Sequence, residues 1–404
     1  MKKGFLSEYF DGVVAKRLSG VESNPMQSNQ HEFNGVIPLK NLFGKERLAD
    51  CPSTFLWFSE ENEVISENSH VTWYDSRESH PTRSEYRLYF KSNPVMDFAK
   101  TGDLLIIARR SSGVIMIIIV SAGSTVENQL LWLFGVSDQI NSDFEYREFE
   151  HRDIAVDFAA RYILEELGID IEDSEAEKMD VLLERFGGKF PKTAIFSSFV
   201  RDTLPEINPL DGADIALLAW IEQEERLFRR LERHIVSDRL KAGFIDDDGA
   251  DVDGFIQFSL SVQNRRKSRA GYALENHLEE VFKTCGVTFD SQAVTENKSK
   301  PDFLFPGGAE YHNPDFPKSS LTMLGVKSTC KDRWRQVLSE AARIPNKHLF
   351  TLEPGISENQ TNEMKANRLQ LVLPRGLHGT YRENQQHWLW DLDSFIRLVN
   401  KRKT

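Results

Sequence analysis

The hydrophobic pattern of this chain changes its period near residue 150. Before that point, Asp103–Arg109 and Val114–Val120 are two runs rich in β-branched residues, separated by a four-residue turn that ends in glycine, as in a β-hairpin. From Asp153 onward, apolar residues recur at helical spacing. Strands bury every second residue and helices every third or fourth, so one regular architecture cannot satisfy both patterns. The chain is therefore predicted to have a mainly β half followed by a half that contains helices.

The first half, residues 1–165, is predicted to be a small barrel or sandwich. Val71–Tyr74 and Ser84–Phe90 combine aromatic residues with polar alternation, as half-buried strands do. The stretch that follows, residues 166–179, is acidic and poor in apolar anchors. We predict that this stretch is a linker.

The second half, residues 180–404, alternates helices with strands, which predicts an α/β domain with a mixed central sheet. Apolar stripes predict helices over Leu217–Leu240, Gly271–Phe282 and about Arg333–Arg343. Short apolar runs predict strands over Val287–Phe289, Phe303–Phe305, Leu321–Val326, His348–Leu352 and Leu369–Leu373.

Composition narrows the class of protein. The 404 residues, 40% hydrophobic and 28% charged, indicate a folded chain with at least two cores. The longest apolar run, Val114–Val120, is far shorter than the roughly 20 residues that span a bilayer. The first residues lack the apolar core of a secretory signal, so we expect a cytoplasmic protein. Three cysteines without zinc-ligand spacing predict free thiols, namely Cys51, Cys285 and Cys330.

Charge is distributed unevenly along the chain. The net charge of −12 argues against a protein coated in positive charge, but DNA binding depends on where the cations lie. Four cations fall within five positions, with no acid between them. They are Arg265, Arg266, Lys267 and Arg269. This segment precedes the predicted helix that bears Glu275, so it could meet phosphates; a solvated loop is the other interpretation.

The sharpest local pattern is Lys300–Phe305, followed by Gly325–Lys331 and then by Glu340. Asp302 starts one apolar run and Lys327 ends another, so we expect both at the edges of neighbouring strands, with Glu340 from the next helix. Such a site suits Mg²⁺, which takes carboxylate oxygens and keeps several waters, while the lysine steadies a phosphate oxygen or a water. The pattern favours metal-assisted phosphodiester hydrolysis, and on spacing alone a purely structural role stays open.

The residues directly after the second run carry donors and one acceptor. Arginine or lysine can pair with guanine and aspartate can accept from cytosine N4, so Lys331, Asp332 and Arg333 are candidates for reading bases. The other interpretation of Asp332 is a helix start, where the helix dipole favours an acid.

Longer motifs resemble a known family. In the second half they are Ser261–Gly271, Lys300–Pro306, Ala309–His312 and Val326–Gln336. With Glu340, they resemble the catalytic half of EcoRII-type type II restriction endonucleases, within the nuclease superfamily named for a Pro-Asp, Asp/Glu and Lys signature. Looser motifs in the first half resemble the effector-binding domain of that family, a pseudobarrel of the type found in plant transcription factors. They are Ala15–Ser19, Asn29–His31, Ile37–Pro38, Trp73–Arg77 and Thr82–Arg87.

The resemblance implies roles for individual residues in catalysis. Asp302 and Glu340 would hold Mg²⁺, and Lys327 would be the catalytic lysine. Tyr311 would be an accessory active-site residue. Glu275 is a weaker candidate for a further carboxylate near the metal.

The resemblance also implies roles in DNA recognition. Lys331, Asp332 and Arg333 would read the C·G pairs of a CC…GG-type target. In the first domain, four residues would grip effector DNA, namely His31, Arg83, Glu85 and Arg87. One departure from the family is Ala219–Glu222, which stands where relatives carry an arginine-rich turn that handles extruded bases. Trp220 in this stretch could stack on such a base or belong to the core.

The implied function is a Mg²⁺-dependent, sequence-specific endonuclease for double-stranded DNA. The resemblance further implies a homodimer through the catalytic domain and an N-terminal domain that binds a second DNA site and autoinhibits. A cognate DNA methyltransferase encoded nearby would fit this class. A modification-dependent endonuclease, whose first domain reads methylated DNA, stays open as the alternative. An inactive, regulatory DNA-binding protein is disfavoured because Asp302, Lys327 and Glu340 are all present.

Overall fold

The computed structural model describes residues 4–23, 31–59, 63–136, 140–149, 155–169, 171, 179–246, 249–330 and 333–402. The chain divides into two compact units. Unit 1 comprises Met1–Asp170, Pro354–Thr361 and Thr380–Asn384. Unit 2 comprises Ile171–Glu353, Asn362–Gly379 and Gln385–Thr404. The predicted linker, residues 166–179, lies mostly outside the described residues, and the linear division at 165 and 180 stays a prediction.

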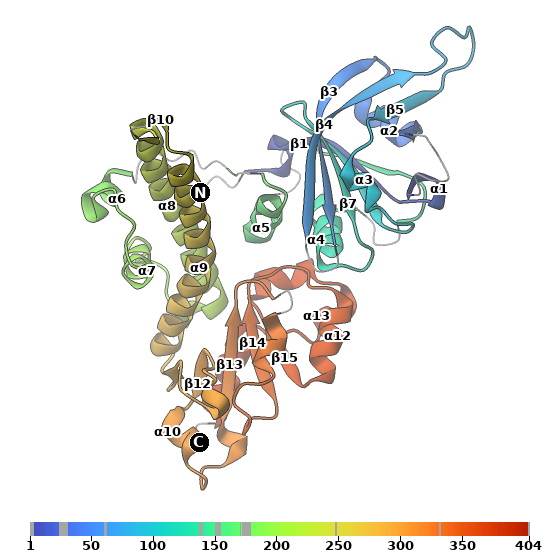
Figure 1. Ribbon diagram of the computed structural model, residues 1–404. Coiled ribbons are helices and arrows are strands. Elements are labelled where there is room, and N and C mark those ends of the chain that lie inside the picture. The colour runs from blue at the N-terminus through green and yellow to red at the C-terminus, as the bar shows by residue number, and fades with distance from the viewer. Residues whose placement is uncertain are drawn as a thin grey trace. The chain divides into compact units, whose positions relative to one another are not determined.

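Unit 1 is built on one eight-stranded sheet in the order β2-β5-β4-β3-β7-β6-β1-β8 (Figure 1). Its strands are β1 Phe10–Arg17, β2 Glu32–Gly35, β3 Leu48–Phe58, β4 Val64–Asp75, β5 Tyr86–Phe90, β6 Leu104–Arg110, β7 Ile115–Val120 and β8 Glu145–Glu148. Its helices in this part of the chain are α1 Gly20–Ser23, α2 Ile37–Phe43, α3 Pro94–Asp97, α4 Thr125–Phe134 and α5 Phe158–Glu166. Neighbouring strands are antiparallel except β3 and β7, which are parallel. The mainly β first half and the β6–β7 hairpin are confirmed, whereas the pseudobarrel stays a prediction.

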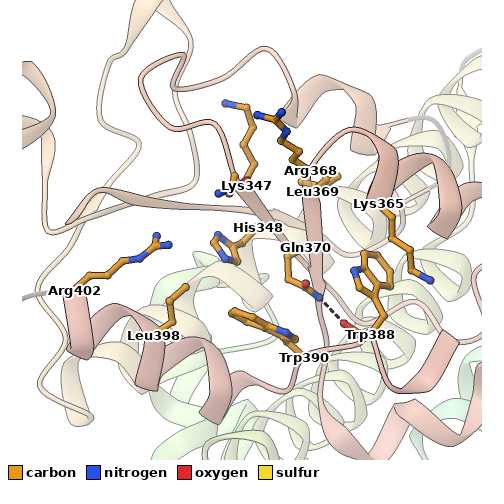
Figure 2. A pocket seen from close by; sticks show the side chains of 11 residues that line it. Lys347, His348, Lys365, Arg368, Leu369, Gln370, Trp388, Trp390, Leu398 and Arg402 are labelled. Carbon is orange, nitrogen blue, oxygen red and sulfur yellow. Dashed lines mark hydrogen bonds between the residues drawn. The ribbon is translucent and has the colours of Figure 1, made fainter. Parts of the chain in front are cut away.

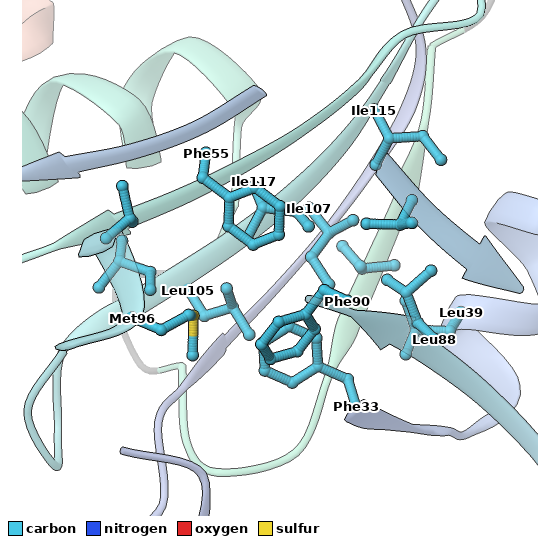
Figure 3. Packing of buried hydrophobic residues seen from close by; sticks show 14 of the residues in the cluster. Phe33, Leu39, Phe55, Leu88, Phe90, Met96, Leu105, Ile107, Ile115 and Ile117 are labelled. Atoms are coloured by element: carbon cyan, nitrogen blue, oxygen red, sulfur yellow. The ribbon is translucent and has the colours of Figure 1, made fainter. Parts of the chain in front are cut away.

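The core of unit 1 explains why its central strands are continuous apolar runs. All six residues of β7 are buried, because both faces of this strand are covered. On one face, aromatic and β-branched side chains interdigitate, as Figure 3 shows for Phe33, Phe55 and Phe90 against Ile107 and Ile117. Burying each such side chain contributes roughly 1.5–3 kcal/mol of transfer free energy.

Unit 2 is built on a five-stranded sheet in the order β11-β12-β13-β14-β15. Its strands are β11 Asp290–Ser291, β12 Phe303–Phe305, β13 Thr322–Lys327, β14 Lys347–Thr351 and β15 Leu369–Val372. The first three pair antiparallel and the last three parallel, so the predicted mixed sheet is confirmed. A separate two-stranded ribbon pairs β9 Ile245–Asp246 with β10 Gly249–Ala250.

The helices of the second half of the chain lie before, between and after these strands. The helices are α6 Met179–Phe186, α7 Thr193–Asp202, α8 Ala213–Ala242, α9 Val252–Thr284, α10 Gly308–His312, α11 Trp334–Val337, α12 Glu358–Ala366, α13 Glu383–Gln386 and α14 Leu392–Arg402. The predicted helix over Leu217–Leu240 is confirmed within α8. None of the described helices is both long and apolar enough to cross a membrane.

Two helix predictions were wrong in their bounds. α9 does not begin at Gly271 but at Val252, where the Asp251 side chain accepts from the Gly254 N–H and caps the helix start. The helix predicted over Arg333–Arg343 is the single turn α11. Ala341 adopts a left-handed backbone with φ 47°, which an α-helix cannot contain, so Glu340 lies in a turn rather than on a helix.

Aromatic packing fixes the position of β12 in unit 2. Phe282 of α9 makes edge-to-face contacts with Phe303 and Phe305, at ring-centroid distances of 5.2 and 5.3 Å. Phe395 of α14 contacts Phe305 at 5.4 Å. Phe303 and Phe305 flank Leu304, so they lie on the same face of this short strand. Their ring contacts hold the strand against α9 and α14. Asp302, directly before β12, is thereby placed beside β13.

Candidate active site

Asp302 lies where β12 begins, against the end of the neighbouring antiparallel strand β13. It is 8% exposed. One carboxylate oxygen, Oδ2, accepts from the Val326 backbone N–H at 2.6 Å and from Lys327 Nζ at 3.2 Å. The other oxygen, Oδ1, accepts from the Gln292 side-chain amide at 3.1 Å. The carboxylate is thus oriented by three donors, which satisfy both of its oxygens.

Lys327 is the last residue of β13 and is paired in register with Thr351 of the parallel strand β14. Its ammonium group is part-buried beside Asp302. The predicted placement of this aspartate and this lysine on adjoining strands is therefore what the structure has. The loop beyond β13 is held by Glu353, whose carboxylate accepts from the Cys330 backbone N–H.

Two further carboxylates lie within electrostatic reach of this pair. Burial raises the pKa of Glu340 to about 7; the nearby charge of Lys327 lowers it, and that of Asp302 raises it. Burial also raises the pKa of Glu275, in α9, to about 7, and the charge of Asp302 adds to this rise. Carboxyl groups held this close and this poorly solvated carry excess negative charge, which a cation would relieve.

Gln292 is a site residue that sequence reasoning missed. Its side chain bonds to both Asp302 and Glu275, so one amide joins two acids from different elements. Gln292 follows β11 with a left-handed backbone, φ 56°, which turns the chain toward Asp302. A lone glutamine in a loop carries no local pattern that would have identified it.

Tyr311 supports the turn that bears Glu340. It is 1% exposed, and its hydroxyl donates to Glu296 at 2.6 and 2.8 Å and accepts from the Arg343 backbone N–H at 3.2 Å. The same glutamate accepts from the Ala342 N–H at 3.2 Å. Burial and the bond to Glu296 raise the pKa of Tyr311 to about 12, so the phenol stays protonated. The contacts of Tyr311 are therefore with the Glu340 turn rather than with Asp302.

Lys347, the first residue of β14, was also missed. Its ammonium group donates to the carbonyls of Glu340, Ala341 and Ile344, and the last two distances are 3.1 Å each. This buried cation holds the turn after α11 in place. Because its partners are backbone carbonyls, no side-chain spacing predicts it.

The donor set fits a hard cation. Glu340 Oε2 is buried and has no hydrogen-bond partner among the described residues, so it is an oxygen ligand without a donor. The charge of Asp302 acts on Glu340, so the Asp302 carboxylate supplies further oxygens within electrostatic reach. Within the described ranges, no three His, Cys, Asp or Glu side chains converge closely enough to hold a metal by themselves. Two carboxylates with waters and a phosphate completing the shell are the arrangement Mg²⁺ accepts.

Of the predicted base-reading residues, Lys331 and Asp332 are outside the described residues. Arg333 is exposed, and its backbone N–H donates to the Cys330 carbonyl at 2.8 Å. The side chain of Arg333 is therefore open to solvent.

The basic segment, residues 265–269, lies within α9 rather than in a loop, and its side chains are not all exposed. Arg269 is 7% exposed, pairs with Glu224 and stacks on Phe228 with 3.8 Å between its guanidinium carbon and the ring centroid. Its predicted phosphate contact is corrected to a packing role, since exposing it would strand Glu224 in the interior. Arg266 bonds to the buried Glu232 at 2.6 Å, and Arg265 covers the Phe190 ring at 4.0 Å. The side chain of Lys267 is outside the described residues.

Trp220 belongs to the core. It is 3% exposed and its ring lies 5.7 Å from that of His277, which bonds to Glu224 at 2.7 Å. A buried indole among such neighbours is not placed to stack on an extruded base.

In unit 1, the predicted effector-binding residues gather on one edge of the sheet. Arg87 of β5 forms ion pairs with Glu85 and, at 3.7 Å, with Glu32 of β2. The His31 carbonyl accepts from the Phe90 N–H at 2.9 Å, which holds residue 31 beside β5. Arg83 is exposed in the connection before this strand. Acids already neutralise Arg87, whereas Arg83 is open to solvent.

Comparison with known proteins finds similarity in the C-terminal half. Residues 228–396 match the family model described as EcoRII C terminal. The type II restriction enzyme EcoRII of Escherichia coli is 40% identical over 230 residues, 57% of this chain and 55% of that enzyme. The type II restriction enzyme SsoII of Shigella sonnei is 26% identical over 156 residues, 35% of this chain and 50% of that enzyme. The chain spans about half the length of these curated relatives.

Two solved structures are similar at lower identity. One is metal-depleted Ecl18kI in complex with uncleaved, modified DNA, with a TM-score of 0.45 and 20% identity, covering 56% of this chain and 83% of that chain. The other is a complex of the restriction endonuclease PspGI with substrate DNA, with a TM-score of 0.42 and 16% identity, covering 57% of this chain and 98% of that chain.

The resemblance inferred from the motifs is thus confirmed where they are most specific. Asp302, Lys327 and Glu340 all lie within the matched residues. Residues 228–396 of this chain are thus similar to the C-terminal domain of EcoRII.

Proposed function

We propose that this chain is a type II restriction endonuclease that hydrolyses double-stranded DNA with Mg²⁺. The observation that carries the proposal is the meeting of Asp302 and Lys327 at the end of β13, within charge reach of Glu340. This meeting occurs inside the part of the chain that matches the EcoRII C-terminal domain.

The chain's own residues divide the chemistry among them. Asp302 and Glu340 would hold Mg²⁺, which when bound lowers the pKa of a coordinated water and offsets charge on the phosphate. Lys327 Nζ, fixed 3.2 Å from Asp302, is placed to orient a phosphate oxygen or the attacking water. Gln292 bonds to both Asp302 and Glu275 and would hold these two side chains in place relative to each other. Tyr311 and Lys347 hold the Glu340 turn from two sides.

Base recognition is proposed for the segment directly after the catalytic strand. Lys331, Asp332 and Arg333 would read C·G pairs of a CC…GG-type target, since arginine and lysine suit guanine and aspartate suits cytosine. The exposure of Arg333 supports this role. Cleavage of both strands would use a homodimer formed through the catalytic half.

The first half is proposed to bind a second copy of the target and to restrain cleavage. Support comes from His31, Arg83, Glu85 and Arg87, which gather at the β2–β5 edge. Further support comes from Pro354–Thr361 and Thr380–Asn384, which follow β14 and β15 along the chain yet belong to unit 1. Within that unit, the Gln129 amide donates to the Pro354 carbonyl at 2.9 Å. Effector DNA bound more tightly by the unrestrained state would shift the chain toward cleavage.

One digestion experiment tests the proposal. A plasmid of known sequence, in methylated and unmethylated forms, is incubated with the full chain and Mg²⁺. Discrete fragments from unmethylated DNA, lost with Asp302→Ala but not with the exposed control Asp315→Ala, are expected. Fragments from methylated DNA alone would instead establish the modification-dependent alternative, with a cognate methyltransferase no longer implied. No cutting of either form would contradict both.

A further inference from the structure

A pocket of about 500 Å³ opens in unit 2 at the amino ends of β14 and β15 (Figure 2). Its volume is within the range of about 300–1,000 Å³ typical of small-ligand sites. Asp302 and Lys327 are at the opposite end of this sheet, since β13 and β14 run parallel and Lys327 pairs with Thr351. The turn that bears Glu340 contacts the pocket through Lys347. His348, which lines the pocket, is three residues upstream of Thr351, about 10 Å along the strand.

The pocket is strongly cationic. Four of its 11 lining residues carry positive charge, and none of the 11 carries a carboxylate. The four are Lys347, Lys365, Arg368 and Arg402. Arg402 donates to the Leu321 carbonyl and to Thr322, which are neutral acceptors. A cluster of cations without a carboxylate in the lining attracts an anion, and guanidinium groups match phosphate geometry.

The pocket is also aromatic. Trp388 and Trp390 are partly exposed in its wall, and Lys365 Nζ lies 4.8 Å from the Trp388 ring centroid. Figure 2 shows Trp390 and Trp388 on the side of the opening nearest to Gln370, whose amide donates to the Trp388 carbonyl at 2.7 Å. Indole faces of this kind stack on flat rings, at about 1–3 kcal/mol per nucleobase.

One residue that lines the pocket, His348, carries a buried acceptor. His348 is 3% exposed, and its Nδ1 has no hydrogen-bond partner among the described residues. The ring bonds to the backbone of Met323, and burial lowers the pKa of His348 to about 4, so the imidazole is neutral. A neutral ring that donates through Nε2 keeps a lone pair on Nδ1. A buried acceptor without a partner is unfavourable, and a ligand N–H would satisfy it.

We propose that this pocket is a binding site for a nucleoside phosphate, separate from the candidate active site. The base stacks on Trp390 or Trp388 and donates an N–H to His348 Nδ1, while the phosphate pairs with Arg368 and Arg402. A simple anion would leave the indoles and the imidazole unused, and an uncharged aromatic would leave the cations without a counter-ion. The ligand is either a free mononucleotide or one nucleotide of a single strand.

The test is calorimetric titration of the full chain with deoxyadenosine monophosphate, in EDTA so that no metal contributes. Saturable binding of one nucleotide per chain is expected, at least tenfold tighter than binding of deoxyadenosine or of inorganic phosphate. Arg368→Asn should weaken it at least tenfold, since asparagine tolerates the left-handed backbone at this position, φ 55°, without the charge. The matched control Arg375→Asn, an exposed arginine outside the lining, should bind as the parent does.

Two further arms separate the outcomes. Asp302→Ala should bind the mononucleotide unchanged, because that residue is at the other end of the sheet. A tetradeoxyadenylate that binds more than tenfold tighter than the mononucleotide identifies a strand as the ligand, and equal affinity identifies the free nucleotide. Absence of saturable binding, equal binding of inorganic phosphate, or binding unchanged by Arg368→Asn would overturn the proposal. None of these results bears on DNA cleavage, so the proposed nuclease function stands or falls separately.

Discussion

The two ends of the central sheet in unit 2 carry opposite charge. At the end of β13, Asp302 pairs with Lys327, and Glu275 and Glu340 lie within electrostatic reach of this pair. At the amino ends of β14 and β15, the pocket is lined by cations and by no carboxylate. The difference shows that the overall net charge of −12 says little about any one surface of this chain.

Lys347 connects the two ends. It lines the cationic pocket, yet its ammonium group donates to backbone carbonyls of the turn that bears Glu340. Its hydrogen bonds go to carbonyls, and Glu340 Oε2 has no hydrogen-bond partner among the described residues. The sheet therefore keeps the acidic end available to a metal and the cationic end available to an anion.

The largest expected effect is at the acidic end. Asp302→Ala should lower Mg²⁺-dependent cleavage by about 10³-fold or more, because a carboxylate that is proposed to hold the metal is lost. Specific DNA binding, measured by gel shift with Ca²⁺ in place of Mg²⁺, should be largely retained. Cleavage at the rate of the Asp315→Ala control would end the assignment of the site.

The helix that supports the cationic end should respond to pH. Asp214 caps α14 by accepting from the Leu392 N–H at 3.0 Å, and burial raises its pKa to about 6 from 3.8. A folded-state pKa above the unfolded value means that the folded chain gains a proton first as pH falls. The contribution of Asp214 to the free energy of unfolding should therefore rise by about 2 kcal/mol from pH 6 to pH 4.

Comparing urea unfolding of Asp214→Asn and of the parent at pH 7 and pH 4 isolates this term from other titrating groups. The free energy of unfolding of the parent, minus that of Asp214→Asn, should be larger at pH 4 than at pH 7. A difference that is the same at both pH values would show that Asp214 does not titrate in this range.

Arg333 tests whether recognition adjoins the acidic end. Loss of a bidentate contact to guanine in Arg333→Ala should cost about 1–3 kcal/mol and relax discrimination at one position. A panel of single-substitution target sites, measured by competition binding, reads this out. Uniform weakening across the panel would mean a phosphate contact instead.

The smallest expected effect is at Gln292. Gln292→Asn keeps an amide and tolerates the left-handed backbone but is one methylene too short to reach both acids. Cleavage should fall about tenfold, with a higher Mg²⁺ concentration needed for half-maximal rate, as for groups that orient metal ligands. The exposed Gln263→Asn is the control. An unchanged Mg²⁺ dependence would remove Gln292 from a positioning role.

Much of the acidic end could be predicted because its groups are local to strands. Asp302 precedes an apolar run and Lys327 ends one, so strand pairing alone brings them together. Gln292, Glu296 and Lys347 could not be predicted, since their partners are backbone groups or side chains of distant loops. The predicted phosphate contact of Arg269, in the basic segment, was wrong for a related reason. Arg269 looks like a surface cation in sequence but lies inside a helix, where its partner Glu224 comes from another helix.

The amino-acid sequence by itself determined the change from a β half to a half with helices, four of the five strands of unit 2 to within one residue, and the pairing of Asp302 with Lys327. These follow from hydrophobic period and strand order, which act over neighbouring residues. The strand predicted over Val287–Phe289 was wrong, because β11 is the two-residue strand Asp290–Ser291 that follows this run. The tertiary structure alone decided which cations are exposed, that the Glu340 turn rests on Lys347, and that His348 is buried with an unpaired nitrogen. Such features depend on desolvation by segments far apart in the chain, and no local pattern records that burial.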